Sequence, residues 1–248
     1  MRTLIAIILI QVIALGAFAN EQDSIPEKGI TEKVYINEAR WMISDLVDGV
    51  MQLGYERKFG ENISLAVNFG LKNENGLIRM SGIETPSIVT SDITYSGFKI
   101  IPEFRYYFKK TQQYQLDGFY VGAYTKYSKF GSNLYGSYFN DEGTEYRIDA
   151  DLNISIVSLG LMVGYKLPIS KRFNVDFLIA APGGSNHRYS LDNNVTLPDE
   201  FYEDVVEALE SYSFFDYLKS DFRWEVKKRR TEFFFPMFRY GISISYRF

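Results

Sequence analysis

The chain of 248 residues contains no cysteine and a single histidine. Without cysteine there is no disulfide scaffold, no thiolate metal site, no cysteine nucleophile and no acyl-anchored N-terminal cysteine. One histidine excludes a metal site built from several histidines, and we expect neither a metal nor a cofactor. Basic residues are outnumbered as well, with 27 Lys and Arg against 31 Asp and Glu. The net charge of −4 argues against nucleic acid as a partner, because nucleic acid requires a basic face.

Long apolar runs are confined to the start of the chain. Residues 4–15 are apolar except for Gln11, and they lie between Arg2 and the small-residue cleavage pattern of residues 17–19. This order is typical of a secretory signal peptide. A membrane anchor is the alternative, but a spanning helix needs about 20 apolar residues. We therefore predict a cleaved signal peptide over residues 1–19 and a periplasmic leader over residues 20–32.

Most of the remaining sequence alternates with period two. Over residues 63–72 every odd position is apolar and every even position is small or polar, and residues 238–248 repeat the pattern. A strand places the two classes on opposite faces, which a helix cannot do. The polar class is rich in Gly and Ser and contains isolated charges, as the narrow interior of an eight-stranded barrel requires. The apolar class, rich in Phe and Tyr, is therefore expected to face lipid.

Connection lengths support a membrane barrel independently. Short connections over residues 60–62, 110–116 and 168–171 alternate with long ones over residues 75–95, 131–144 and 191–232. Bacterial outer-membrane barrels have short periplasmic turns and longer outer loops. We predict an all-β fold: an eight-stranded antiparallel transmembrane β-barrel over residues 33–248, with both ends periplasmic. The expected strands are residues 33–43, 49–59, 62–74, 96–109, 117–130, 145–167, 172–189 and 233–248.

The long outer loop over residues 191–232 contains a different pattern. Residues 198–219 place apolar side chains on one helical stripe, and Pro198 suits the first position of a helix. We predict an extracellular helical insertion before the last strand, folded over the barrel mouth. The apolar even positions of residues 148–156 would pack against this stripe. Whether that core is solid or binds a small hydrophobic ligand stays open.

The same loop ends in a basic run. Lys227, Lys228, Arg229 and Arg230 would lie at the outer rim, where they are candidates to contact lipopolysaccharide phosphates. A partner-binding surface on the helix is the alternative.

Isolated charges share the inward parity of the predicted strands. These residues are Glu56, Glu103, Arg105, Asp176 and Arg239. Charges inside a barrel that holds little water must pair, so we predict an interior ion network. A gated pore or proton path is the functional alternative, although eight strands are too few for an open channel.

Catalysis has one candidate pair. Ser185 and His187 share a face of one strand, and a Ser/His pair can support acyl transfer. The pair lies in a glycine-rich stretch near the strand end, with no orienting acid evident in the sequence. We predict a non-enzymatic protein and keep a lipid A-modifying enzyme as the alternative.

The last residues, with Tyr246 and Phe248 on the apolar face, resemble the terminal strand signal that the barrel assembly machinery reads. Three stretches carry a wider resemblance: LGYER at 53–57 before ISL at 63–65, GFKIIPEFRYY at 97–107 and GFYVGAY at 118–124. They resemble a family of uncharacterised outer-membrane β-barrels common in Bacteroidota and, more loosely, the small OmpA/OmpX class. The resemblance implies the fold and a location in the bacterial outer membrane, but no reaction.

These observations together predict a role in envelope structure or surface interaction. The expected partners are outer-membrane lipid, lipopolysaccharide and, during biogenesis, the barrel assembly machinery. We expect a monomer. A barrel that binds a small hydrophobic ligand is the further alternative.

Overall fold

The computed structural model describes residues 34–74, 82, 84–92, 94–201, 204 and 230–248. The predicted signal peptide, the periplasmic leader, most of the predicted helix and Lys227, Lys228 and Arg229 lie outside these residues. Within them, no helix is long and apolar enough to cross a membrane. The strands are β1 (Asn37–Met42), β2 (Val50–Phe59), β3 (Ile63–Lys72), β4 (Ile88–Thr90), β5 (Tyr95–Tyr107), β6 (Gly118–Phe139), β7 (Glu145–Pro168), β8 (Phe173–Asn193) and β9 (Arg230–Arg247). Two short 3-10 turns, η1 (Ser44–Leu46) and η2 (Lys109–Thr111), complete the regular structure outside residues 199–204.

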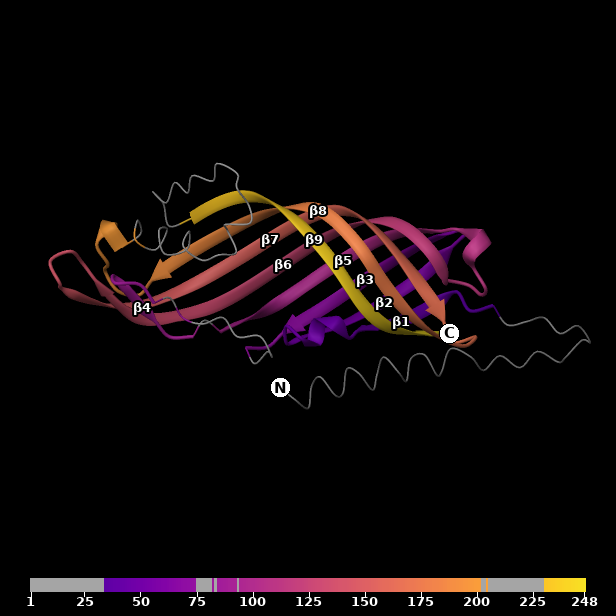
Figure 1. Cartoon of the computed structure of the whole chain (residues 1–248), viewed down its shortest axis with the longest axis horizontal. Helices are drawn as coiled ribbons and strands as arrows, with labels where there is room; N and C mark the ends of the chain where they lie inside the picture. The colour runs from indigo at the N-terminus through magenta and orange to yellow at the C-terminus, as the bar shows by residue number, and fades with distance from the viewer. Residues whose placement is uncertain (1–33, 75–81, 83, 93, 202–203, 205–229) are drawn as a thin grey trace, which may run out of the picture.

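Eight of these strands form a closed ring (Figure 1). Each pairs antiparallel with its neighbours, and β1 pairs with β9 through Trp41 opposite Ile244, which closes the circle. The predicted eight-stranded antiparallel barrel is therefore confirmed. β4 lies outside the ring and pairs with β6 beyond the start of β5, Thr90 opposite Gly136. The sequence pattern did not predict β4.

The turns at one end of the barrel are short, as predicted. Gly60 begins the turn between β2 and β3 with a φ of 70°, which favours glycine. The C-terminus lies at this end of the barrel, opposite the hairpin turn between β6 and β7 (Figure 1). The short turns and the C-terminus therefore lie at the same end, the one that the sequence predicts to be periplasmic.

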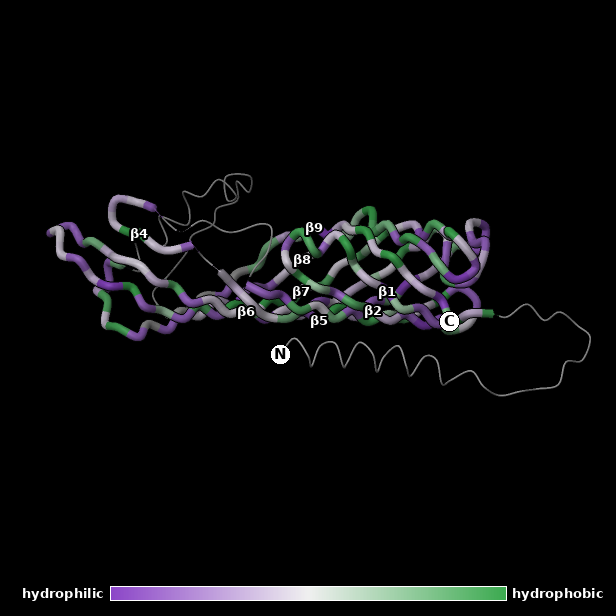
Figure 2. The backbone as a smooth tube through the Cα atoms, turned by 90° about the horizontal axis from the view of Figure 1, so that it is seen from below, coloured by the Kyte–Doolittle hydropathy of each residue, from purple (hydrophilic) through white to green (hydrophobic). Residues whose placement is uncertain are grey.

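The outward face is apolar and the inward face is polar. Figure 2 shows hydrophobic and hydrophilic residues alternating along the strands of the ring. In β3 exposed and buried positions alternate without a break, with Leu65 and Phe69 outside and Ser64 and Asn68 inside. Outward apolar side chains continue around the ring, for example Leu161 at 68% exposure. A water-soluble barrel would turn these side chains inward, so the exposed belt is the surface that a bilayer covers.

The belt ends where outward side chains become polar. Lys129 on β6 and Asn186 and Arg188 on β8 point outward and are exposed. Above this level lie the outer parts of β6, β7, β8 and β9, which make the wall of the barrel taller on one side (Figure 1).

The prediction of a long loop over residues 131–144 is wrong. β6 and β7 pair continuously from Gly118 opposite Lys166 to Phe139 opposite Glu145, and only a tight turn with Gly143 connects them. Above the belt, the outer face meets water instead of lipid. The alternation that marks the membrane strands is therefore inverted there, and Gly, Ser and Asn at outward positions resemble a loop.

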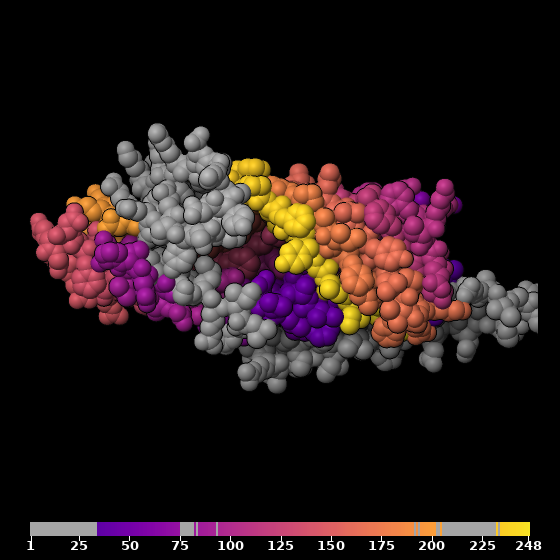
Figure 3. Space-filling model, in the orientation of Figure 1, coloured from indigo at the N-terminus to yellow at the C-terminus, as the bar shows by residue number. Residues whose placement is uncertain are grey.

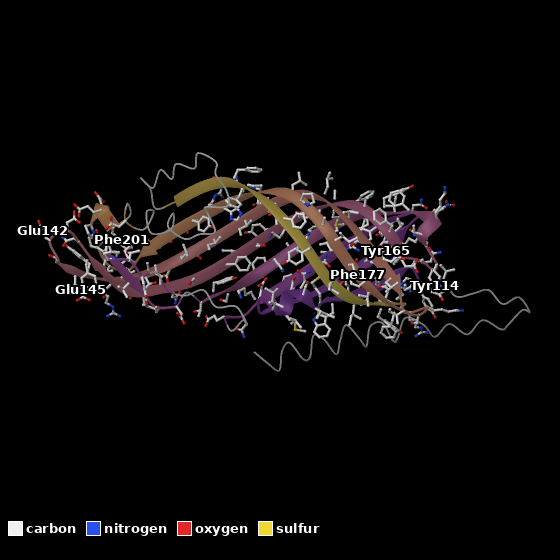
Figure 4. The ribbon with its side chains drawn as sticks, in the orientation of Figure 1. Tyr114, Glu142, Glu145, Tyr165, Phe177 and Phe201 are labelled. Atoms are coloured by element: carbon white, nitrogen blue, oxygen red, sulfur yellow. The ribbon has the colours of Figure 1, made fainter. Side chains whose placement is uncertain are left out.

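A hydrophobic core lies within this tall wall. It contains Ile88, Leu134, Tyr138, Ile148, Ala150, Leu197 and Phe201. Residues 199–201 and 204 are helical, so a helix begins where Pro198 predicts it. Figure 4 shows Phe201 at the end of the molecule that carries Glu142 and Glu145, far from Tyr165 and Phe177. Ile148 and Ala150 therefore pack against the first residue of the predicted helix stripe, in the predicted orientation.

One irregularity changes which side chains face the lumen. β8 carries a bulge between Leu178 and Ala181. Buried positions are even below it, as at Asp176, and odd above it, as at Ser185. The extra residue thus turns Ser185 and His187 to the same inner side as Asp176.

Candidate functional site

The lumen of the membrane-spanning part is filled by eight ionised side chains, here called the interior ion network. They are the acids Glu38, Glu56, Glu103 and Asp176 and the bases Arg40, Arg105, Lys166 and Arg239. They come from β1, β2, β5, β7, β8 and β9, so the network connects most of the ring.

Two guanidinium groups lie at its centre. Arg105 binds Glu103 at 2.7 Å and Asp176 at 2.8 Å. Arg40 binds Glu56 at 2.8 Å and reaches Glu103 and Asp176 at 3.4 Å. Both guanidinium groups bind carboxylates from opposite sides of the barrel, which is the planar recognition that Arg performs best.

Lys166 forms the second part of the network. Its ammonium lies 2.6 Å from Glu38 and 2.7 Å from Glu56. The other carboxylate oxygen of Glu38 accepts a hydrogen bond from Asn174 at 2.8 Å. Lys166 and both of its carboxylates have fully buried side chains, so each depends on the others for compensation.

Neutral donors satisfy further carboxylate oxygens. Ser64 and Tyr107 donate to Glu56 at 2.5 and 2.7 Å, and Tyr120 donates to Asp176 at 2.8 Å. The Arg105 guanidinium also lies 4.4 Å from the centre of the Tyr120 ring. Hydrogen-bonded charges of both signs in equal number are a stable filling for a dry lumen.

Glycines on the inner face make room for the tyrosine rings. A Cβ atom at Gly164 would meet the Tyr120 hydroxyl at 2.3 Å, and one at Gly160 would meet Tyr124 at 2.6 Å. These glycines are therefore required by close packing inside the barrel.

A separate ion pair lies toward the end of the barrel that carries the short turns. Arg247 contacts Asp117 at 3.2 Å and donates to the carbonyls of Gln115 and Ser170 at 2.7 Å. Together with the network it places paired, buried charges across the lower half of the lumen.

The structure brings together all five charged residues that the sequence places inside. Glu56, Glu103, Arg105, Asp176 and Arg239 belong to one connected network. The sequence interpretation missed Glu38, Arg40 and Lys166. Their signal was present, because Arg40 shares the parity of Glu38, and Lys166 shares that of the inward Gly164.

The outer half of the lumen has a different charge balance. Lys99 pairs with Asp45 of η1 at 2.5 Å, and Lys72 donates to the Asp48 carbonyl at 2.5 Å. Lys126 on β6 shares the inward parity of the buried Tyr124 and Ser128. Figure 3 shows the surface hollowed between the yellow strand β9 and the indigo residues of the short wall.

Ser185 and His187 do come together. The Ser185 hydroxyl lies 2.8 Å from His187 Nε2 and 3.0 Å from the Phe235 carbonyl oxygen. Burial, with a contribution from the charge of Lys126, lowers the pKa of His187 below its ordinary value. The hydroxyl has one proton for two acceptors, so when it donates to Phe235 the imidazole must be the donor and cannot act as its base.

The remaining predicted residues lie at the two ends. Tyr246 stacks on Phe248, and the Phe248 amide donates to the Asn37 carbonyl at 2.9 Å, which ties the last residue to β1. Arg230 begins β9, while the other members of the basic run lie outside the described residues. Among the described residues, no group of three or more His, Asp or Glu side chains is arranged to hold a metal ion.

Comparison with known proteins gives two matches. A family model described as "Protein of unknown function (DUF3575)" matches residues 34–196. A crystal structure of CarO from Acinetobacter baumannii aligns with a TM-score of 0.39 and 11% identity, covering 87% of this chain and 98% of that one. No curated protein matches the sequence.

Proposed function

We propose that this chain, which belongs to the DUF3575 family of unknown function, is a non-enzymatic outer-membrane β-barrel with a closed lumen. In this proposal the barrel anchors a tall extracellular wall that serves envelope structure or surface interaction. One observation carries the proposal. A lipid-compatible exterior encloses a lumen filled by paired charges, so the membrane part holds the chain in place without providing a path.

Three features support an outer-membrane location. The strands of the ring are antiparallel and even in number, the turns at one end are short, and the terminal aromatic residue directly follows the last strand. The signal peptide over residues 1–19 and delivery to the barrel assembly machinery stay part of the proposal, as do the Bacteroidota source and the OmpA/OmpX likeness.

Topology is testable because the chain has no cysteine. Asp141 lies in the β6–β7 turn and Glu61 in the β2–β3 turn, and both are exposed. In intact cells a membrane-impermeant maleimide should label Asp141→Cys and leave Glu61→Cys unlabelled until the cells are lysed. Labelling of Glu61→Cys in intact cells would invert the proposed orientation.

The closed lumen is tested by electrophysiology. The purified protein, inserted in a planar bilayer, should give no steady conductance, with its slower gel migration after boiling as proof that the barrel had folded. A stable ohmic conductance from the folded protein would refute a closed lumen and favour the pore alternative.

Lipid and lipopolysaccharide are the proposed partners. Arg188 is exposed at the upper edge of the apolar belt, where lipopolysaccharide phosphates would lie. The basic run that ends at Arg230 would extend this rim. A closed ring offers no free strand edge in the membrane, which supports a monomer.

A lipid A-modifying enzyme is the second candidate, favoured by the 2.8 Å contact between Ser185 and His187. Ser185 is buried on the lumen side, whereas lipid A would lie outside the barrel. The lipid A profile of cells that produce His187→Ala, measured by mass spectrometry, decides between the two. If a lipid A modification is missing from cells that produce His187→Ala and present in cells that produce the parent protein, the enzyme replaces the non-enzymatic proposal.

A further inference from the structure

The level of the lumen above the interior ion network collects positive charge. Lys99 on β5, Lys126 on β6 and Arg239 on β9 face it, and electrostatic interactions link Lys126 to both of the others. One carboxylate, Asp45, faces the same level and is bound by Lys99. Arg239 is bound from below, 3.5 Å from Glu103. The charge of Asp45 also acts on Lys126, but among the described residues Lys126 forms no ion pair of its own.

Strand register places hydroxyl groups beside Lys126. Ser158 on β7 is directly opposite Lys126, and Ser185 on β8 is directly opposite Ser158. Both serines are inward-facing and almost fully buried, at 2% and 1% exposure. An ammonium group and two hydroxyls thus lie across three neighbouring strands at one height.

Two donors at this level have no partner within the described residues. They are the Ser158 hydroxyl and Nη1 of Arg239, both shielded from solvent. The side chain of Arg239 is held in place, with its guanidinium 4.5 Å from the centre of the Tyr124 ring. Buried donors of this kind are costly unless an acceptor is supplied.

The two levels of the lumen differ in their charge balance. In the network below, four acids face four bases, and Arg239 is included among those bases. Above it, Lys99 and Lys126 face Asp45 alone, whereas Lys72 contacts the Asp48 carbonyl and the Tyr95 ring and interacts with the charge of Asp48. An acceptor with negative charge would correct both deficits, the surplus charge and the unpartnered donors.

We propose that this level is a binding site for a small oxyanion, formed by Lys126, Nη1 of Arg239 and the Ser158 hydroxyl. Charge-assisted hydrogen bonds from ammonium and guanidinium groups are the usual means of holding such an anion. The site lies above the interior ion network, so in the orientation proposed above the anion would arrive from outside the cell. Arg239 belongs to both levels, because its Nη2 lies 3.5 Å from Glu103 in the network while its Nη1 is the group that would bind the anion.

Isothermal titration calorimetry of the detergent-solubilised protein with inorganic phosphate tests the site, at constant ionic strength set with chloride. The parent should bind phosphate at a single site. Lys126→Gln should weaken binding about tenfold, as the loss of one charged hydrogen bond predicts. Lys129→Gln is the matched control, since it removes the same charge three residues along β6 from an outward, exposed position, and it should bind like the parent.

A gain-of-affinity variant guards against misfolding as an explanation. Asp45→Asn removes the competing carboxylate and releases Lys99, so phosphate should bind more tightly than to the parent. The only histidine provides a second readout, because His187 senses the charge of Lys126. Its nuclear magnetic resonance signals should shift with phosphate in the parent, and in Lys126→Gln they should shift only at about tenfold higher phosphate.

Three outcomes would overturn the proposal. They are no binding to the folded parent, equal losses in Lys126→Gln and Lys129→Gln, or binding of lipid A micelles with no binding of free phosphate. The last result would assign the phosphate affinity to the outer rim instead of the lumen. The conductance measurement tests the closed lumen, and the calorimetry tests the anion site. Failure of one proposal is therefore distinguishable from failure of the other.

Discussion

Replacement of Lys166 by methionine is the sharpest test of the interior ion network. Lys166 neutralises Glu38 and Glu56, but these two carboxylates do not depend on it equally. Glu56 keeps Arg40 at 2.8 Å and Arg105 at 3.5 Å after the change. Among the described residues, Glu38 keeps only the amide of Asn174 as a hydrogen-bond partner, so Lys166→Met leaves one buried carboxylate without a cation.

The magnitude follows from that single unpaired charge. Removing one partner of a buried ion pair costs about 3–5 kcal/mol, because the other charge stays desolvated. We therefore expect Lys166→Met to lower the free energy of unfolding by about 3 kcal/mol or more. Adding Glu38→Gln removes the orphaned charge while keeping a hydrogen bond to Asn174, so the double variant should recover at least half of the loss.

The assay is urea unfolding in lipid vesicles, followed by the heat-dependent shift in gel migration that separates folded from unfolded barrels. Lys129→Met is the control, since it removes an exposed lysine on the outer face and should stay within about 0.5 kcal/mol of the parent. The reasoning fails if Lys166→Met unfolds with the parent, or if the double variant is no more stable than the single one.

Three further predictions concern other parts of the molecule. Gly164→Val drives a side chain into the Tyr120 ring and should lower the free energy of unfolding by about 1–3 kcal/mol. Tyr120→Ala should partly restore it, and equal stability of Gly164→Val and the parent would contradict the close packing. Phe201→Ala removes a fully buried ring from the extracellular core and should cost about 3 kcal/mol, read as protease sensitivity of the outer wall in intact cells, whereas an unchanged digestion pattern would show that Phe201 does not hold it. The imidazole of His187 should titrate below its ordinary pKa in histidine-labelled protein, because burial disfavours its charged form. Folding favours the neutral imidazole, so its contribution to stability is present above the ordinary pKa and is lost as the pH falls through the lowered pKa of the folded protein. Titration of His187 at or above the ordinary pKa would contradict its burial.

The strands of the membrane part were predictable because their two faces meet lipid and a packed lumen. Residues 63–72 and 238–248 alternate for this reason, and their assignment needs no knowledge of any partner strand. The outer parts of β6 and β7 obey the same geometry, but both of their faces meet different surroundings from those in the membrane. Alternation alone does not reveal that change, so residues 131–139 were interpreted as a loop.

The bulge in β8 was beyond sequence interpretation for a related reason. Residues 178–181 are all apolar, so an extra residue among them leaves no break in the pattern. The contact between Ser185 and His187 was predicted from their two-residue spacing, which a bulge below them does not change. Their inward direction depends on the bulge and required the structure.

Charge neutrality offers a stronger criterion than parity for the interior. The five residues predicted from the sequence comprise the acids Glu56, Glu103 and Asp176 and the bases Arg105 and Arg239. A sealed lumen does not tolerate this excess of one negative charge, so the set was incomplete and required a further base. The missed residues Glu38, Arg40 and Lys166 restore neutrality when they are added. The same criterion, applied to the level above, finds Lys99 and Lys126 opposed by Asp45 alone. An excess that the protein's own carboxylates do not correct is the reason to expect an anion there.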